Sequence, residues 1–373
     1  MRIGFDAKRA FLNNTGLGNY SRDTINLLSN YIPSNQYFLY TTEIKKNPRT
    51  SFISARNNIF IQKPKSLLNK TFKTYWRSKN IIKDLYKDNI EIYHGLSNEI
   101  PLGIEKTSIK SVVTIHDLIF IRYPHFFNTT DRKIYFKKFH SSCKRADKII
   151  AVSEQTKKDI INFFSINKEK IHVVYQGCNQ VFQNKIENND IKNVLKKHKI
   201  PQDFLLYVGT IEERKNLLTL LKSLKKLPNQ TLIVIGDGNS YKLKCEKFIK
   251  ENQLNERVIF LSKLILKDIA AIYKAAKIMI YPSIFEGFGI PIIESLFSNT
   301  PVITSKDGCF IEAGGPNTKY VNPLSVLEIK NAIKEIDNSS EIQKNMTSKG
   351  FKYVQKFTDQ VISNNLMEIY NKL

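Results

Sequence analysis

Apolar residues along this chain occur in short, nearly continuous runs rather than in alternation with polar residues. Continuous runs of this length are typical of strands buried on both faces of a parallel sheet. A first series lies at residues 2–6, 37–41, 58–62, 90–94, 111–115, 148–152 and 171–175. A second series lies at residues 204–209, 231–236, 258–262, 278–281 and 301–304. The pattern therefore predicts two parallel sheets in tandem.

Segments of helical length separate many of these strands, for example residues 217–227 and 267–276. Strands that alternate with helices predict the α/β class with doubly wound sheets. A length of 373 residues also suits two domains better than one. We expect Rossmann-like domains at residues 1–182 and 201–354, with the polar stretch 183–200 as the linker region. In this architecture ligands bind beyond the carboxyl ends of the strands.

The composition excludes several classes of protein. Hydrophobic residues make up 42% of the chain, which is typical of a soluble globular protein. No apolar run approaches the roughly 18 residues of a membrane-spanning helix, and the first residues lack the features of a secretory signal. The four cysteines are scattered without a C-x-x-C pair. This spacing argues against a zinc site or a disulfide framework and favours a reducing cytoplasm.

The formal net charge of +24 adds a question about partners. A basic surface attracts nucleic acid, an anionic membrane or a phosphate-bearing substrate. Residues 69–89 and 131–148 both interleave cations with aromatic residues. Two interpretations stay open for them: a membrane or acceptor surface, or ordinary amphipathic helices in a lysine-rich protein. Nucleic-acid binding is disfavoured because no recognised module for it is present.

A glycine turn follows the first strand, in "NNTGLGNY". Gly16 and Gly18 precede a predicted helix, where backbone N–H groups and the helix dipole favour a phosphate. As a dinucleotide fingerprint the turn fails, because it starts ten residues after the strand and has Ser21 at the third glycine position. A dehydrogenase is therefore disfavoured, and a plain loop-to-helix turn remains an alternative.

Histidine and aspartate follow the strand at 111–115, in "VVTIHDLIF". His116 at a strand end predicts a contact with a sugar hydroxyl or with developing charge, although a structural role is the alternative. His94 is a weaker candidate of the same kind. The six histidines show no spacing typical of metal ligands, so we expect no metal site.

Two cations follow the strand at 204–209, in "YVGTIEERKNLL". Arg214 and Lys215 are predicted to open a helix, a position that cations normally avoid because the dipole there is already positive. An anion such as a diphosphate between them would explain the pair, whereas solvated surface cations are the alternative. Gly209 ends this strand. The next strand ends in Gly236-Asp237-Gly238, which suits the wall of a nucleotide pocket, with a plain turn as the alternative.

The stretch "SIFEGFGIPIIES" places Glu286 on a glycine-containing loop and Glu294 about one turn into a helix. Pro291 suits the start of that helix. A carboxylate can accept two hydrogen bonds from a vicinal diol, and a nucleotide sugar has such diols on its ribose and its hexose. Gly287 and Gly289 would let the donor lie close to the backbone.

Together these motifs resemble the signature of glycosyltransferase family 4. The similarity rests on "GTIEERKNLLTLLKSL", "IGDG" and "PSIFEGFGIPIIESLFSNTPVITS", with its E-x7-E motif, and on "TGLGNY" and "VVTIHDL" in the first half. The resemblance implies a GT-B fold with the active site between two Rossmann-like domains, of which the first, 1–182, binds the acceptor and the second, 201–354, binds the nucleotide sugar. It also implies that a last helix, about residues 355–373, packs back on the first domain. Transfer would be retaining and would need neither a metal nor another cofactor.

The same resemblance implies residue roles. Glu286 would hold the hexose hydroxyls, and Glu294 would hold the ribose. Arg214 and Lys215 would bind the diphosphate, and His116 would contact the hexose. The other positions matched to donor binding are Gly16, Gly18, Gly209, Gly238, Gly287, Phe288 and Gly289.

Some positions depart from the family pattern. Thr210 stands where many members have an arginine, so Arg214 is expected to carry more of the phosphate charge. Glu213 replaces the usual proline. Residues 309–323 also differ, which leaves the loop after strand 301–304 less well defined.

The resemblance is strongest to bacterial enzymes that add mannose or related hexoses to surface polysaccharides. We therefore expect transfer of a hexose, with mannose favoured, from a nucleotide sugar to a lipid-linked or oligosaccharide acceptor in the cytoplasm. Peripheral contact with the inner membrane is a further expectation. A GT-B epimerase and a glucan synthase are the alternatives. No carboxylate in the sequence is clearly placed to act as a nucleophile, which favours front-face attack. Replacing Glu286 by alanine should abolish transfer and leave folding intact.

Overall fold

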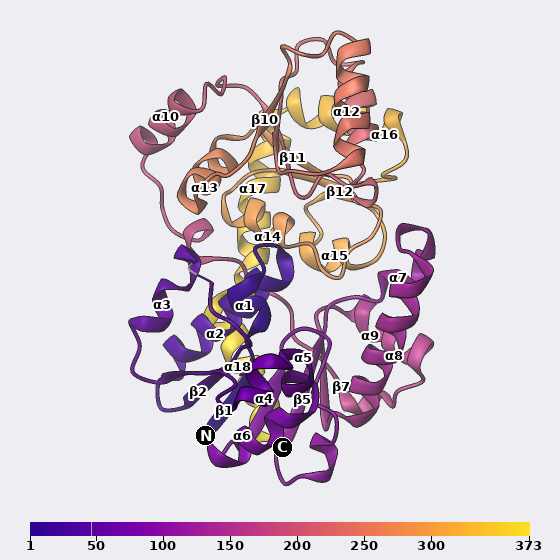
Figure 1. The fold of residues 1–373 in the computed structure, drawn as a ribbon. Helices are drawn as coiled ribbons and strands as arrows, with labels where there is room; N and C mark the ends of the chain where they lie inside the picture. Colours follow the sequence, from indigo (N-terminus) through magenta and orange to yellow (C-terminus); the bar gives the residue numbers. More distant parts are fainter. Residues whose placement is uncertain (46) are drawn as a thin grey trace. The chain divides into compact units, whose positions relative to one another are not determined.

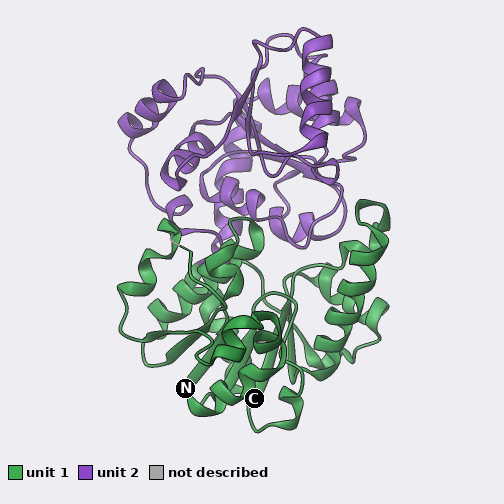
Figure 2. Cartoon of the chain, viewed as in Figure 1, with its two compact units in different colours: residues 1–176, 359–373 green, residues 177–358 purple. Residues whose placement is uncertain are grey.

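The computed structural model describes residues 1–45 and 47–373, which form two compact units (Figure 2). Unit 1 consists of Met1–Gln176 and Asp359–Leu373, and unit 2 of Gly177–Thr358. The C-terminal segment thus belongs to the same unit as the N-terminus, although more than 180 residues separate them in sequence.

In the described part of unit 1, seven parallel strands form one sheet with the order β3-β2-β1-β4-β5-β6-β7. The strands are β1 (Arg2–Asp6), β2 (Gln36–Tyr40), β3 (Ile59–Gln62), β4 (Ile92–Gly95), β5 (Lys110–Ile115), β6 (Lys148–Ala151) and β7 (Ile171–Val173). The helices are α1 (Lys8–Leu12), α2 (Gly16–Tyr31), α3 (Ser51–Ser54), α4 (Leu67–Thr71), α5 (Lys73–Tyr75), α6 (Ile81–Lys87), α7 (Ile119–Arg122), α8 (Thr129–Arg145), α9 (Glu154–Phe164) and α18 (Asp359–Asn371).

Both faces of this sheet are buried, as the continuous apolar runs predict. Tyr37 and Leu39 of β2 lie in one hydrophobic cluster, together with residues of α2 and α18. Phe38 and Tyr40 lie in the other, together with residues of α6, α8 and α9. Successive side chains of a strand point to opposite faces, so each face of β2 needs its own apolar pair.

Helix α18, yellow in Figure 1, is fixed to unit 1 by packing and by hydrogen bonds. Leu366 and Ile369 lie in the same buried cluster as Phe5 of β1. Tyr370 contacts His94 of β4, with 2.7 Å between the hydroxyl oxygen and Nδ1. The last helix of the chain is therefore part of the core of unit 1.

In unit 2, the described strands form a six-stranded parallel sheet with the order β10-β9-β8-β11-β12-β13. The strands are β8 (Leu205–Val208), β9 (Leu232–Ile235), β10 (Val258–Leu261), β11 (Ile278–Tyr281), β12 (Val302–Ser305) and β13 (Lys319–Val321). The helices are α10 (Asn188–Lys197), α11 (Leu217–Leu224), α12 (Ser240–Glu251), α13 (Leu266–Ala275), α14 (Ile290–Phe297), α15 (Cys309–Gly314), α16 (Val326–Asp337) and α17 (Ser340–Val354).

Two features of unit 2 differ from the sequence-based expectation. The stretch 183–200, predicted as a linker, contains α10 and belongs to unit 2. Its C-terminal end is held there by Asp268, whose Oδ2 accepts hydrogen bonds from Lys197 Nζ at 2.8 Å and from His198 Nε2 at 2.7 Å. Strand β13 was not predicted, because three residues at a sheet edge leave too short an apolar pattern.

The strand orders define where ligands are expected. In each sheet the order reverses between two central strands, β1 and β4 in unit 1 and β8 and β11 in unit 2. The crevice at the carboxyl ends of such a strand pair is the usual ligand site in doubly wound folds. Within the described residues, no helix combines the length and apolarity needed to cross a membrane.

Candidate active site

The two predicted phosphate-binding cations lie in a 3-10 turn, Glu213–Lys215, between β8 and α11. They therefore precede helix α11 rather than open it, which corrects the sequence-based placement. Asn216 separates the turn from the helix with φ of 59°. Its amide donates hydrogen bonds to Pro282 O at 3.2 Å and to Pro323 O at 2.6 Å. These bonds fix the turn against the loop that follows β11.

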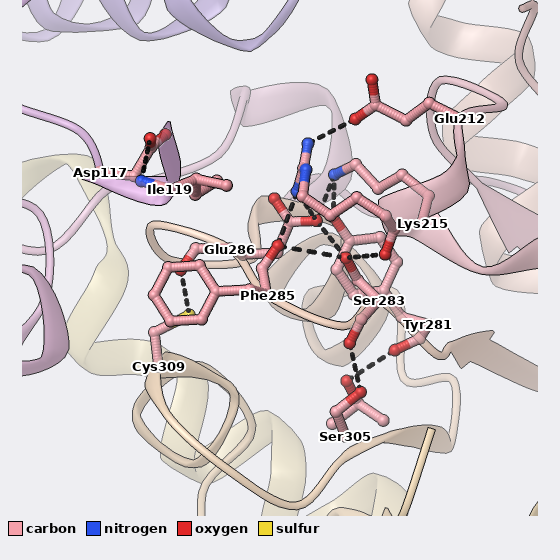
Figure 3. Close-up of polar contacts among 12 residues, drawn as sticks. Asp117, Ile119, Glu212, Lys215, Tyr281, Ser283, Phe285, Glu286, Ser305 and Cys309 are labelled. Atoms are coloured by element: carbon pink, nitrogen blue, oxygen red, sulfur yellow. Dashed lines mark hydrogen bonds and ion pairs between the residues drawn. The ribbon is translucent and has the colours of Figure 1, made fainter. Parts of the chain in front are cut away.

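The anion between the two cations is Glu286 itself (Figure 3). Its Oε1 lies 2.8 Å from Arg214 Nη1 and 2.5 Å from Lys215 Nζ. The hydroxyl of Ser283 donates a third hydrogen bond to Oε1 at 2.5 Å. Because β8 and β11 are neighbours, the loops after them bring together residues 71 positions apart in sequence. The cluster lies at the topological switch point of the sheet.

Burial and charge oppose each other in this cluster. Burial alone would raise the pKa of Glu286, but Arg214 and Lys215 more than offset it and lower this pKa to about 2. Burial lowers the pKa of Lys215, while the carboxylate of Glu286 opposes that effect. For Arg214, burial is outweighed by Glu286 and Glu212, and the pKa is raised. Glu286 is therefore a fixed anion at neutral pH and a weak base.

Several neighbours that sequence reasoning missed complete the cluster. Lys215 Nζ also donates to the hydroxyl of Tyr281 at 2.6 Å, and burial raises the pKa of that phenol well above its usual value. Arg214 donates to Glu212 Oε1 at 2.5 Å. Cys309 Sγ donates to the carbonyl oxygen of Glu286 at 3.2 Å. The position of Tyr281 at the end of a predicted strand was the signal available in the sequence.

Helix α14 carries the second carboxylate of the motif. Glu294 is partly buried on this helix and accepts a hydrogen bond from the hydroxyl of Tyr273 at 2.8 Å. Gly289 caps the helix with φ of 114°, a conformation that favours glycine. Phe288 is buried with its ring 5.4 Å from that of Phe357, so this side chain belongs to the core.

Glycines let the backbones beyond β8 and β9 approach closely. A Cβ on Gly236 would lie 2.0 Å from the carbonyl oxygen of Gly209. A Cβ on Gly238 would lie 2.1 Å from the carbonyl oxygen of Ile211. Gly209 and Gly236 also have positive φ, 149° and 154°. Any other residue at position 236 or 238 would push these two loops apart.

In unit 1, the predicted phosphate turn is closed by a side chain of the protein. Gly18 lies in the first turn of α2, and its amide donates to Asn13 Oδ1 at 3.2 Å. A Cβ there would lie 1.9 Å from the carbonyl oxygen of Asn13, so glycine is required for packing. Gly16 has open space around its Cα, with no heavy atom within 4 Å of a Cβ placed there. Of the two, Gly16 is the one that a ligand can approach without rearrangement.

His116 is buried beyond the end of β5, and both of its ring nitrogens have partners. Nε2 lies 2.8 Å from the carbonyl oxygen of Leu96, and Nδ1 lies 3.2 Å from Gln176 Nε2. These contacts match a neutral ring that donates from Nε2 and accepts at Nδ1. Burial lowers its pKa to about 4. His94, the weaker candidate, is fully buried between Tyr370 and Thr114, with its pKa lowered to about 3, and is part of the core.

The predicted site residues thus form two groups. Unit 1 holds Gly16, Gly18 and His116, and unit 2 holds Gly209, Arg214, Lys215, Gly238, Glu286, Gly287, Phe288, Gly289 and Glu294. The structure brings Arg214, Lys215 and Glu286 into direct contact. Among the described residues, no group of three or more His, Cys, Asp or Glu side chains is arranged to hold a metal ion.

Comparisons with known proteins identify the family. Residues 187–353 match the model described as "Glycosyl transferases group 1", and residues 37–180 match "Glycosyltransferase Family 4". The chain is also 30% identical over 266 residues to the O-antigen chain mannosyltransferase RfbU of Salmonella typhimurium, an alignment that covers 71% of this chain and 69% of that protein. The chain belongs to glycosyltransferase family 4. This confirms the resemblance inferred from the motifs.

Other relatives of this glycosyltransferase agree. The O-antigen chain mannosyltransferase B of Escherichia coli is 26% identical over 295 residues, covering 77% of this chain and 75% of that protein. Among solved structures, Anabaena HepE in complex with UDP and glucose superimposes with a TM-score of 0.80 at 18% identity, over all of both chains. The lipopolysaccharide glycosyltransferase WaaG gives a TM-score of 0.73 at 16% identity, over 99% of both chains. These structural matches confirm the predicted GT-B fold.

Proposed function

We propose that this glycosyltransferase moves a hexose, with mannose favoured, from a nucleoside-diphosphate sugar to a growing, lipid-linked, cell-surface glycan. The observation that carries the proposal is the buried cluster of Glu286 with Arg214 and Lys215 at the switch point of unit 2. The names of the relatives supply the choice of mannose, since two of them are O-antigen chain mannosyltransferases. HepE, which shares the fold, binds UDP-glucose in its crystals.

The cluster suits a diphosphate donor for an electrostatic reason. When the bond to the leaving diphosphate breaks, negative charge develops on its oxygens, and Arg214 and Lys215 are fixed cations that stabilise it. In the free protein Glu286 balances both cations. When the diphosphate pairs with Arg214 and Lys215, the carboxylate of Glu286 interacts less with them and can accept hydrogen bonds from the hexose hydroxyls. We assign the ribose to Glu294 on α14.

We propose that transfer is retaining and uses no protein nucleophile, and the low basicity of Glu286 supports this. A carboxylate whose pKa is about 2 is a poor nucleophile and a poor general base at neutral pH. We therefore favour front-face attack. The bond from the sugar C1 to the diphosphate oxygen breaks, the acceptor oxygen bonds to C1 on the same face, and the acceptor proton passes to the leaving diphosphate oxygen. No step in this scheme uses a metal ion or another cofactor.

His116 is proposed to contact the hexose from unit 1. Its Nε2 bond to Leu96 O is the shorter of its two ring contacts, 2.8 Å against 3.2 Å for Nδ1 with Gln176. A sugar hydroxyl that replaces the longer bond could donate to Nδ1 while Leu96 holds the ring. The backbones of Gly16 and Gly18 are assigned to the phosphates, and Gly16 has the space for it.

Peripheral contact with the cytoplasmic face of the membrane is the proposed location. Leu67, Leu68 and Phe72, on and after α4, expose 85%, 59% and 57% of their surface among lysines. Apolar side chains with basic neighbours suit an anionic lipid surface. The double change of Leu67 and Leu68 to serine should lower sedimentation with anionic vesicles. Leu243→Ser in unit 2, at a residue 67% exposed, is the matched control and should have no effect.

The function is tested with a panel of GDP- and UDP-sugars, a lipid-linked acceptor and a measurement of nucleotide release. Lys215→Ala should reduce the rate on the order of 100- to 1,000-fold, whereas Lys222→Ala on the exposed side of α11 should leave it unchanged. A chelator should not affect the rate. Interconversion of free nucleotide sugars without transfer would favour the epimerase, and a product of repeated glucose units would favour the glucan synthase.

A further inference from the structure

Unit 1 contains a cavity of about 420 Å³ at the carboxyl end of its central strands. Its wall includes Asp6, the last residue of β1, and Tyr93 of β4, the strand pair at which the order of this sheet reverses. The volume is in the range of small-ligand sites. The rest of the wall comes largely from the two segments, 69–89 and 131–148, whose cations and aromatic residues stood out in the sequence. The fold thus brings these distant segments to one cavity.

A network of charges lines this cavity. Arg77 lies 2.5 Å from Asp6 Oδ2 through Nη2 and 3.2 Å from Glu99 Oε2 through Nη1. Glu99 is also 3.3 Å from Lys138 of α8. The side chains of Asp6 and Arg77 are only 3% and 15% exposed. Charges are costly to bury unless they are paired, and a paired network that lines a cavity makes that cavity a candidate binding site.

The arrangement mirrors that of unit 2. There, one carboxylate lies between two cations, and here one cation, Arg77, lies between two carboxylates. Both clusters follow the central strands of their sheets at the switch point. A carboxylate has about four lone-pair sites, so Glu99, with one cation on each oxygen, can still accept hydrogen bonds from sugar hydroxyls. Both oxygens of Asp6 are occupied by Arg77 and by the amide of Lys8, so Asp6 fixes the arginine.

The rest of the cavity offers two other kinds of contact. Lys137 of α8 lines it, is exposed, and forms no ion pair with any described residue. Leu102 and Ile134 also line it while exposing 49% and 44% of their surface. The cavity therefore combines acceptors for hydroxyls, cations for an anion and an apolar part in contact with solvent.

We propose that this cavity binds the glycosyl-diphosphate end of a lipid-linked acceptor. The carboxylate of Glu99, which is 27% exposed, takes the sugar hydroxyls, while Asp6 holds Arg77 in place. Lys137 and Lys138 take the diphosphate, and Leu102 with Ile134 takes the first carbons of the lipid. The proposal rests on the proposed function and names the place and chemistry of the second substrate. A free sugar, which has neither charge nor tail, would use only the first set of contacts.

The test measures binding of octyl mannosyl diphosphate to the full chain by calorimetry. Octyl mannoside, which lacks the diphosphate, should bind on the order of 10- to 100-fold more weakly, because charge-assisted hydrogen bonds are lost. Mannosyl diphosphate without the octyl chain should bind about tenfold more weakly or worse, because a few methylenes no longer leave water. Equal affinity for all three compounds would overturn the proposal.

Variants locate the binding. Lys137→Glu should weaken binding of the octyl diphosphate on the order of 10- to 100-fold and raise the acceptor KM without changing the donor KM. Lys344→Glu, the same change at an exposed helical lysine of unit 2, should do neither. Glu99→Gln, which keeps the shape and removes the charge, should weaken the octyl mannoside as well.

The outcomes separate this proposal from the proposed function. If a nucleotide sugar binds and is transferred but Lys137→Glu leaves the acceptor KM and the probe affinity unchanged, the cavity is not the acceptor site. If no nucleotide sugar binds, the proposed function fails. Binding of the octyl diphosphate that still depends on Lys137 would then support the cavity as a glycolipid site by itself.

Discussion

Replacing Glu286 by glutamine tests the central cluster with a small change of shape. The substitution removes one negative charge and keeps the side-chain length. It removes the carboxylate that now lies 2.8 Å from Arg214 and 2.5 Å from Lys215, which leaves Arg214 paired with Glu212 alone and removes the anion of buried Lys215. The glutamine amide can still accept the hydrogen bond of Ser283, so the main loss is electrostatic.

The structure gives the size of the effect. The two cations hold the pKa of Glu286 at about 2 instead of the usual 4.5, which corresponds to about 3 kcal/mol of stabilisation by the ionised form. Breaking a buried ion pair by removing one partner typically costs a similar amount, about 3–5 kcal/mol. We expect Glu286→Gln to lower the free energy of unfolding of unit 2 by about 3 kcal/mol at pH 7. This differs from the prediction made from sequence, that losing Glu286 leaves folding unaffected.

The dependence on pH distinguishes this cause from a packing defect. Because the folded pKa is lowered, the stabilisation is fully present above pH 4.5 and is lost as the pH falls from there towards 2. The difference in stability between wild type and variant should therefore fall to less than about half at pH 3 and disappear only towards pH 2 and below. Urea unfolding followed by circular dichroism at pH 7 and pH 3 measures this difference. Hydrogen exchange of peptides covering β8, α11 and β11 places it in unit 2.

A control variant and two possible results test the electrostatic role of Glu286 in stability. Glu335→Gln removes a carboxylate that is 47% exposed and paired with Lys319, and should change stability by less than about 1 kcal/mol. A Glu286→Gln protein as stable as wild type at pH 7 would refute the reasoning. A difference that is as large at pH 3 as at pH 7 would refute the electrostatic cause. The variant should also bind inorganic pyrophosphate at least as tightly as wild type, because the cations have lost their competing anion.

Two other predictions concern packing and histidine. Gly236→Ala should destabilise unit 2 by about 2 kcal/mol or more in thermal unfolding, because its Cβ would lie 2.0 Å from Gly209 O. Gly16→Ala, with no heavy atom within 4 Å, should leave stability unchanged, and the opposite order would contradict the packing argument. Burial lowers the pKa of His116 from 6.5 to about 4, so unit 1 should lose about 3 kcal/mol of stability as the pH falls across that range. The fluorescence of Trp76, the one tryptophan of the chain and buried in unit 1, measures this loss of stability. If the stability of His116→Gln depends on pH as steeply as that of wild type, the prediction is wrong.

Most of the strands were predictable because their signal is local. Strand β1 coincides with the predicted run 2–6, and β11 with 278–281. The predicted helix 267–276 is shifted by one residue from α13. Local patterns failed where the apolar content was small, as in β13, or where a polar surface helix resembled a linker, as in α10.

The candidate site was predictable in its members but not in its contacts. Arg214, Lys215 and Glu286 stood out because cations before a helix and a carboxylate among glycines are unusual in sequence. That the carboxylate is itself the anion between the cations depends on β8 and β11 being neighbours. The same holds for His116, whose position at a strand end was visible but whose ring partners, Leu96 and Gln176, were not.

The sequence by itself therefore determined the α/β class, the two series of strands, the family and the residue types of the candidate site. These features can be recognised from hydrophobic periodicity and motif spacing, which are patterns within a few tens of residues. The tertiary structure alone decided which charges meet. Lys215 pairs with Glu286, and Arg77 pairs with Asp6, each across 71 residues. Such pairs form because the strand order of a sheet, which no local pattern encodes, brings the ends of distant strands to the same edge.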